Sequence, residues 1–64
     1  MKKVYTSREF KRLLIDNGYV YKRTTGDHMI YGNGKNTISF NIRNLNRMVA
    51  RRLIKENNLI TKNT

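Results

Sequence analysis

The stretch YVYKRTTGDHMIYGNGKNTISFNI, residues 19–42, decides the fold of this chain. Aromatic and β-branched residues interrupted by glycines are typical of short strands joined by turns. We predict three antiparallel strands, at Tyr19–Thr24, His28–Tyr31 and Thr37–Ile42. A turn at Thr25-Gly26 should join the first two, and a tight hairpin with an Asn-Gly pair at Gly32-Asn33-Gly34 should join the last two.

The third strand alternates most clearly between apolar and polar residues. One set of alternate positions holds Ile38, Phe40 and Ile42, and the other holds Thr37, Ser39 and Asn41. This pattern predicts a sheet that is covered on one face only. The register of the second strand stays open, because either His28 with Ile30 or Met29 with Tyr31 could face the core.

A helix should precede the sheet, from Ser7 to Asn17. Thr6 and Glu9 have the spacing of a capping box, and Tyr5 with Phe10 can form a hydrophobic staple. Apolar residues then recur at helical spacing, and Asn17-Gly18 supplies a left-handed stop.

A second helix should follow Arg43, capped by Asn44 or Asn46 and fading near Asn57-Asn58. Its apolar face is predicted from residues three and four apart, namely Leu45, Met48, Val49 and Leu53. Leu59 and Ile60 should return to the core. The predicted fold class is therefore α+β, a single α-β-β-β-α domain over residues 1–64 with two helices on one face of a three-stranded antiparallel sheet.

Charge and size restrict the function. The chain has 64 residues, 14 Lys plus Arg against 4 Asp plus Glu, and a net charge of +10. A domain this small cannot enclose a large cofactor pocket, so its function should lie on the surface. Such positive charge favours a polyanionic partner, most often nucleic acid, ahead of an acidic protein or an acidic membrane.

The residue types also exclude several kinds of site. There is no Cys and one His, so neither a thiolate nucleophile nor a structural metal site is expected, and we predict no cofactor. The longest apolar run, Leu13 to Ile15, is far too short to cross a bilayer, and the N-terminal residues do not resemble a signal peptide. A soluble, cytoplasmic protein is predicted.

His28 is the first candidate for chemistry, because imidazole titrates near neutral pH. A partly buried strand histidine with satisfied ring nitrogens is the plain alternative. The basic residues on or beside the sheet form a candidate phosphate-binding surface, or else only a solvated face; they are Lys22, Arg23, Lys35, Arg43 and Arg47. The tyrosines at 19, 21 and 31 are candidates for base stacking or for the core, with Tyr19 favoured as core.

These motifs resemble the HicA family of mRNA interferase toxins. The resemblance is carried by Gly18-Tyr19, the basic turn after it, Gly26 with His28, and the helix ending in Leu59-Ile60, and it covers nearly the whole chain. That family is similar in topology to double-stranded-RNA-binding domains, and its motif is Gly-Ser-His. Asp27 stands here where the family has Ser, and Asn41-Ile42-Arg43 stands where the family often has Pro and a second His.

The resemblance implies a metal-independent endoribonuclease with His28 as the catalytic acid or base. RNA supplies its own nucleophile, the 2′-OH, so the enzyme needs to orient it, move its proton and stabilise the charge on phosphorus. Lys22, Arg23, Lys35 and Arg43 would bind phosphate, and the backbone at Gly26 would approach it closely. The resemblance further implies an acidic HicB-type antitoxin that covers His28.

Two other classes of function remain open at this stage. One is a non-catalytic module that binds double-stranded RNA through phosphate and 2′-OH contacts. The other is a structural or DNA-binding accessory protein.

Overall fold

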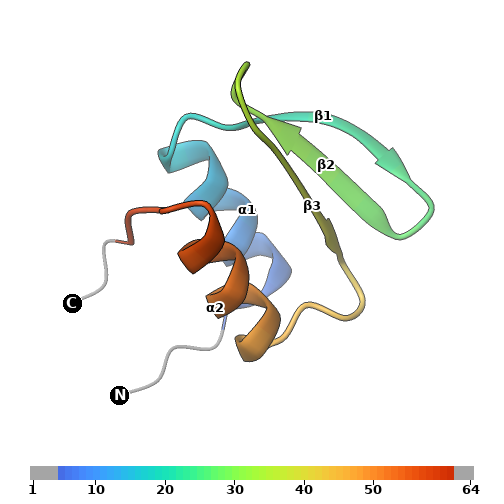
Figure 1. Ribbon diagram of the computed structural model, residues 1–64. Coiled ribbons are helices and arrows are strands. Elements are labelled where there is room, and N and C mark those ends of the chain that lie inside the picture. Colours follow the sequence, from blue (N-terminus) through green and yellow to red (C-terminus); the bar gives the residue numbers. More distant parts are fainter. Residues whose placement is uncertain (1–4, 62–64) are drawn as a thin grey trace.

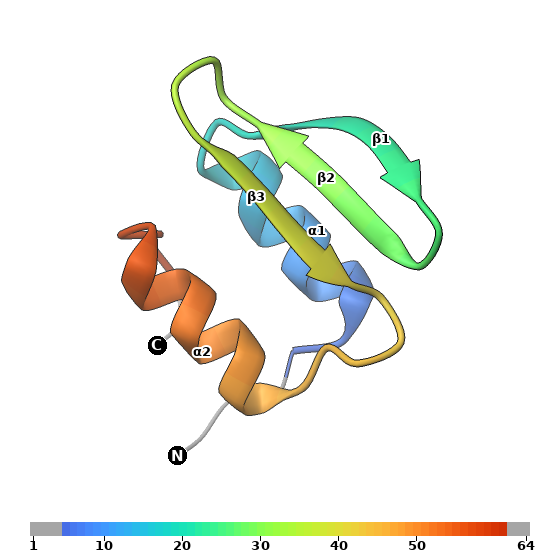
Figure 2. The same cartoon turned by 45° about the vertical axis from the view of Figure 1, so that its right-hand side comes forward.

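The computed structural model describes residues 5–61. Its elements follow the predicted order, α1 (Ser7–Asp16), β1 (Val20–Thr25), β2 (His28–Gly32), β3 (Thr37–Asn41) and α2 (Arg47–Glu56). The strands form one antiparallel sheet in the order β1-β2-β3. Both helices lie on the same face of this sheet (Figures 1 and 2). The predicted fold class is confirmed.

Local side-chain contacts define the start of α1. The Thr6 hydroxyl accepts a hydrogen bond from the Glu9 amide at 3.1 Å, and the Glu9 carboxylate accepts one from the Thr6 amide at 3.1 Å. Tyr5 contacts Phe10 edge to face, with ring centroids 6.1 Å apart. The capping box and the staple are both confirmed, and they satisfy amide groups that a helix N-terminus otherwise leaves unpaired.

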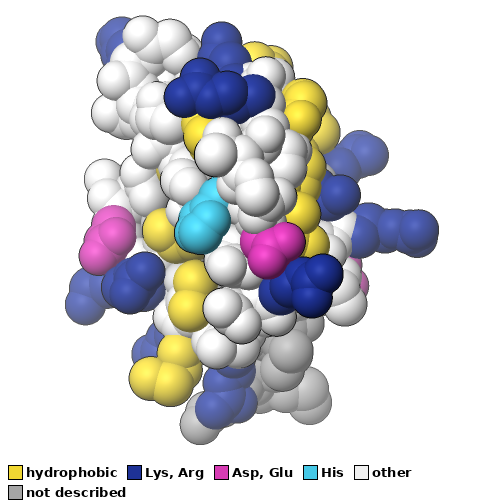
Figure 3. Space-filling view, turned by 90° about the vertical axis from the view of Figure 1, so that its right-hand side faces the viewer, with side chains coloured by type: hydrophobic (Ala, Val, Ile, Leu, Met, Phe, Trp, Pro, Cys, Tyr) yellow, Lys and Arg dark blue, Asp and Glu magenta, His cyan; other side chains and the backbone are white. Residues whose placement is uncertain are grey.

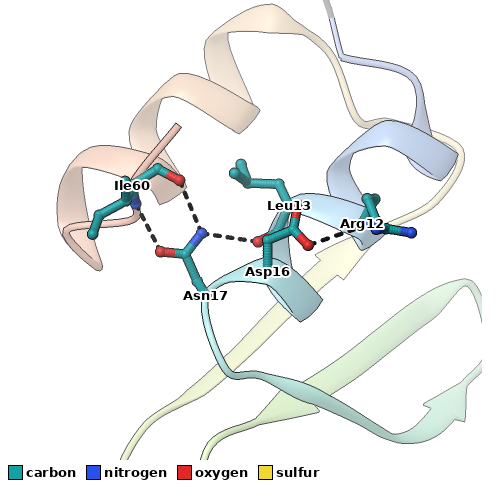
Figure 4. Close-up of polar contacts among 5 residues, drawn as sticks. All are labelled: Arg12, Leu13, Asp16, Asn17 and Ile60. Carbon is teal, nitrogen blue, oxygen red and sulfur yellow. Dashed lines mark hydrogen bonds and ion pairs between the residues drawn. The ribbon is translucent and has the colours of Figure 1, made fainter. Parts of the chain in front are cut away.

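The end of α1 is joined to the C-terminal segment by one side chain (Figure 4). The Asn17 amide nitrogen donates to the carbonyls of Leu13 at 2.9 Å and Ile60 at 3.0 Å, and its oxygen accepts from the Ile60 amide at 2.7 Å. Asn17 therefore fastens the chain after α2 onto α1, and this holds Leu59, 8% exposed, in the core.

Replacing Asn17 with alanine should lower the free energy of unfolding by about 1–2 kcal/mol, because hydrogen bonds of this kind contribute about 0.5–1.5 kcal/mol each. Urea unfolding followed by circular dichroism measures this change. Asn57→Ala is the matched control, since Asn57 occupies the same position after α2 but donates a single side-chain hydrogen bond, to the Leu53 carbonyl at 3.0 Å. Equal losses in the two variants would contradict the fastening role of Asn17.

The second helix begins at Arg47 and is capped by Asn46 rather than Asn44, because the Asn46 side chain accepts from the Val49 amide at 2.9 Å. Two residues of α2 and the segment after it that were predicted to be in the core are exposed: Met48 is 76% exposed and Ile60 is 74% exposed. Met48 lies on the opposite side of the helix from Ala50 and Leu53, which are buried. Ile60 points outward because Asn17 holds its backbone and Leu59 takes the inward position.

The inner face of the sheet packs against the helices. The Met29–Tyr31 alternative for β2 is the observed one, because Met29 pairs with Phe40 and Tyr31 pairs with Ile38, and both partners are buried. The core cluster comprises Phe10, Leu13, Leu14, Tyr19, Tyr31, Ile38, Phe40, Ala50, Leu53 and Leu59. Ile42 was predicted to share the inner face with Ile38 and Phe40, but it does not belong to the core. β3 ends at Asn41, and Ile42 is 36% exposed.

Both turns of the sheet differ slightly from the prediction. Gly26 and Asp27, rather than Thr25 and Gly26, form the first turn, with Gly26 at φ 61 and Thr25 paired with His28. Glycine at the first central position with positive φ is typical of a type II′ hairpin turn. The second hairpin uses the longer loop 33–36, where the Asn33 side chain accepts from the amides of Lys35 and Asn36.

Tyr31 makes the stability of the domain sensitive to alkaline pH. Burial, and secondarily the neighbouring Tyr21, raise the pKa of Tyr31 above its usual value of 10.0. The unfolded chain therefore loses this proton first as the pH rises. The free energy of unfolding should fall once the pH passes that ordinary value, and Tyr31→Phe should remove part of that fall.

The measurement is urea unfolding of wild type and Tyr31→Phe at neutral and alkaline pH. Tyr21→Phe should have a smaller effect, because it removes only the lesser cause of the shift in the pKa of Tyr31. An alkaline loss of stability that is the same in wild type and Tyr31→Phe would show that other groups cause it.

Candidate functional site

The face of the sheet that points away from the helices is called here the open face. Residues paired across neighbouring strands lie on the same face, and residues two apart along one strand also share a face. The residues that alternate with Met29, Tyr31, Ile38 and Phe40 therefore belong to the open face, and they are Val20, Arg23, Thr25, His28, Ile30, Gly32, Thr37, Ser39 and Asn41. Apart from Val20, Ile30 and Gly32, these residues have polar or charged side chains.

A β-bulge places two cations on the open face. Tyr21 pairs with Tyr31 and Arg23 pairs with Ile30, so Lys22 is the additional residue of β1. The Lys22 side chain lies over Gly32, where a Cβ would come within 3.1 Å of the Lys22 Cε. Without the bulge, strict alternation after Tyr21 would turn Arg23 to the inner face.

His28 is the first residue of β2 and is exposed on the open face. Thr25 of β1 and Asn41 of β3 pair with it on either side. It directly follows the turn at Gly26 and Asp27. The alternative of a partly buried strand histidine is therefore wrong, because the helices cover the opposite face, where Met29 and Tyr31 lie.

Asp27 connects this turn to the segment that follows β3. Its carbonyl accepts from the Ile42 amide at 2.9 Å, and its carboxylate oxygen Oδ1 lies 3.4 Å from Nε of Arg43. The Asn41 side chain accepts from the amides of Arg43 at 2.8 Å and Asn44 at 3.1 Å. These contacts hold the guanidinium of Arg43 beside the turn that carries His28.

The exposure of this ion pair shows what it contributes. The side chains of Arg43 and Asp27 are 78% and 54% exposed, and exposed pairs contribute about 0–1 kcal/mol to stability. The contribution is therefore mainly positional. The positive charge of Arg43 offsets the negative charge that Asp27 adds beside His28. Asp27 contacts Nε of Arg43, which leaves the two Nη groups of the guanidinium for other partners.

The predicted site residues divide between the two ends of β2. Gly26, His28 and Arg43 meet at its start, whereas Lys22 and Lys35 lie at its end, beside and after Gly32. Arg23 lies between them, opposite Ile30. The two ends are separated by four strand residues, about 13 Å. Figure 3, viewed from the side where the sheet lies, shows Lys and Arg side chains above and below the histidine, with an acidic side chain beside it.

The tyrosines do not form a stacking surface on the open face. Tyr19 and Tyr31 are each 3% exposed and belong to the core, which confirms the prediction for Tyr19. Tyr21 is 51% exposed but contacts Tyr31 edge to face, with centroids 5.8 Å apart, and its hydroxyl hydrogen-bonds to Thr24. Its ring therefore lies at the edge of the inner face.

Two residues of this site were not predicted to have a role in its geometry. Asn41 organises the turn after β3, and Asp27 positions Arg43. The signal for Asn41 was its residue type at the end of a strand pattern, since Asn side chains readily bond to backbone amides two or three residues ahead. The contact between Asp27 and Arg43 left no local signal.

The structure describes residues 5–61 of the chain. No group of three or more His, Cys, Asp or Glu side chains suited to holding a metal ion occurs in this part of the chain. Neither helix there has the length and apolar character needed to cross a bilayer.

No protein-family model, curated protein or solved structure matches this chain.

Proposed function

We propose that the protein is a HicA-type mRNA interferase, a metal-independent endoribonuclease toxin of a toxin–antitoxin pair. The observation that carries the proposal is the exposed His28 directly after the turn whose Asp27 holds Arg43, on a chain with a net charge of +10. An imidazole and a guanidinium at the same end of β2 supply what RNA cleavage needs, a group that transfers protons and a group that binds phosphate.

The chemistry follows from the substrate's own nucleophile. The 2′-oxygen attacks the adjacent phosphorus, a 2′-O–P bond forms, and the bond from phosphorus to the 5′-oxygen breaks. The products are a 2′,3′-cyclic phosphate and a 5′-hydroxyl. His28 either accepts the 2′-OH proton while water protonates the leaving 5′-oxygen, or donates a proton to that oxygen while water accepts the 2′-OH proton. Each role contributes about 10²- to 10⁴-fold in rate.

Arg43 and the other cations bind and orient the phosphates. With Nε directed to Asp27, the terminal Nη groups of Arg43 are free to donate two parallel hydrogen bonds to phosphate oxygens. Arg23 and Lys22 extend this positive surface along the open face, and Lys35 extends it into the loop after β2. Gly26 lies in the turn that precedes His28. Because it has no side chain, a phosphate can approach its backbone closely.

An acidic HicB-type antitoxin would inhibit this activity by covering the open face and His28. The charge of the chain supports rapid capture by a partner of opposite charge, because complementary charge raises association rates.

The test compares RNA with DNA of the same sequence as substrates for the purified protein in EDTA. The RNA should be cut to fragments that end in 2′,3′-cyclic phosphate, and the DNA should stay intact because it has no 2′-OH. A single 2′-deoxy linkage at a mapped cleavage site should block cutting there. Cutting of both polymers, or of neither by a folded protein, would contradict the proposal.

A second candidate function is a non-catalytic module that binds double-stranded RNA. The α-β-β-β-α order with two helices on one face favours this function. The HicA family, which this chain resembles, is similar in topology to double-stranded-RNA-binding domains. The same assay separates the two candidates, since this function requires binding to duplex RNA without any cleavage.

A further inference from the structure

Helix α2 carries a line of three exposed cations, Arg47, Arg51 and Lys55, which we call the α2 stripe. They are four residues apart, so they lie on the same side of the helix, about 6 Å from one to the next and about 12 Å from first to last. The buried residues of the helix, Ala50 and Leu53, lie on another side. The stripe belongs to the surface and not to the packing of the core.

The stripe cations differ from other cations on the same helices. Arg12 pairs with Asp16 at 3.2 Å, and Arg52 pairs with Glu56 at 3.9 Å, in both cases at the i, i+4 spacing. In the part of the chain from residue 5 to 61, no ion pair or hydrogen bond involves a side chain of the stripe. Its charge is therefore available to a partner.

This arrangement is unfavourable for the isolated helix. Arg47 is the first residue of α2, at the positive end of the helix dipole, and the first turn contains no acidic residue. Arg51 has a like charge one turn away on each side, which is also destabilising. A polyanion lying along the stripe would remove both costs, so the positions of these charges indicate a partner.

We propose that the α2 stripe binds the phosphate backbone of RNA and extends the contact surface beyond the open face. The choice of RNA as the polyanion rests on the proposed function. The exposed side chains of α2 are charged apart from Met48, which lies beside the stripe and is 76% exposed, whereas centres of protein–protein interfaces are enriched in aromatic residues and depleted in Lys. Nucleic-acid interfaces are polar and strongly positive. An acidic protein is the alternative that the test must separate.

The segment between β3 and α2 links the two surfaces along the chain. Arg43 stands beside the turn that carries His28, and Arg47 follows four residues later at the start of α2. Figure 2 shows the short loop that leads from the end of β3 to this helix. In this proposal an RNA strand follows the connection from Arg43 to Arg47.

The test measures how RNA binding depends on salt. The stripe variant contains Arg47→Gln, Arg51→Gln and Lys55→Gln. The control variant contains Arg8→Gln, Lys11→Gln and Arg12→Gln on α1, so both lose three positive charges. Both also carry His28→Ala so that the probe stays intact. The probe is a fluorescein-labelled RNA of about 20 nucleotides, single-stranded or as a duplex, which is longer than typical single-strand sites.

In the stripe variant, the slope of log K against log [salt] should become about 2 smaller in magnitude, because each neutralised phosphate contributes about 0.7–0.9. The control variant should keep most of its slope. Arg51→Gln alone should lower the magnitude by about 0.7–0.9, which repeats the test with a single change. Equal changes in the two triple variants would overturn the proposal. Polyglutamate serves as a probe for an acidic protein partner. A stripe variant that binds polyglutamate more weakly than the protein without the stripe substitutions does, but binds RNA equally well, would also overturn the proposal.

This experiment is independent of cleavage. A changed slope together with no cutting by wild type would leave the stripe as an RNA-binding surface and reject the nuclease. Normal cutting together with an unchanged slope would reject the stripe and leave the nuclease.

Discussion

Replacing His28 with alanine should slow RNA cleavage by about 10²- to 10⁴-fold and leave the thermal unfolding of the protein almost unchanged. The large effect is expected because His28 is the only histidine of the chain, and imidazole is the side chain that most often serves as a general acid or base. The small effect on stability is expected because His28 is exposed, and substitutions at such positions change stability by about 0.5 kcal/mol or less. Initial cleavage rates in EDTA and thermal melts measure the two quantities.

His28→Gln gives a sharper version of this experiment. Glutamine keeps hydrogen-bonding capacity but does not transfer protons at neutral pH. It should bind RNA as wild type does and still fail to cut it, which separates chemistry from binding. Cleavage by either variant at the wild-type rate would exclude His28 as the catalytic residue.

The largest loss of stability should come from Phe10→Ala, at about 3–5 kcal/mol. Phe10 is fully buried and packs edge to face against Phe40, with ring centroids 5.1 Å apart, so it joins α1 to β3. A domain of this length has a total stability of only about 3–10 kcal/mol. The variant should therefore be partly or largely unfolded at room temperature, as urea unfolding followed by circular dichroism will measure.

Two substitutions on the same helix calibrate this result. Ile15→Ala removes an apolar side chain that is 54% exposed, so it should cost far less. Phe10→Leu keeps most of the buried volume and should lie between the two. A loss below about 1 kcal/mol for Phe10→Ala would mean that this ring is not central to the core.

The elements of the fold were predictable because their signals are local. Thr6 and Glu9 determine the start of α1 by contacts three residues apart. The alternation of Ile38 and Phe40 with polar residues gave the orientation of β3. The error at Met48 has a local origin too: its spacing from Leu45 matches a helical pattern, but on α2 it lies on the side opposite Ala50 and Leu53, while its neighbour Val49 packs against the core.

Other features depend on contacts between distant residues. The two faces of β2 are similarly apolar in sequence, and the choice depended on the burial of Ile38 and Phe40, which pair with Tyr31 and Met29. The bulge at Lys22 lets Tyr21 and Arg23, two residues apart, lie on opposite faces of the sheet. No glycine or proline in the sequence marks it. The pairing of Asp27 with Arg43 arises because β3 brings the end of the sheet to the first turn.

For the candidate site, residue types were therefore easier to predict than their grouping. His28, Gly26 and Arg43 were singled out from the sequence and lie close together in the fold. Lys22 and Lys35 were singled out with them but lie at the other end of β2. Charge and residue type do not determine which cation is near the histidine; the register of the strands does.

The bulge at Lys22 also affects how the protein behaves at high concentration. β1 is an edge strand of the sheet, and a straight edge offers unpaired backbone groups to which another chain can add a strand. The extra residue bends and twists this edge near its middle and puts a lysine there. Stacking of many copies through β1 would thus lose hydrogen bonds and bring like charges together, so the irregularity that brings Arg23 to the open face also protects the chain against edge-to-edge aggregation.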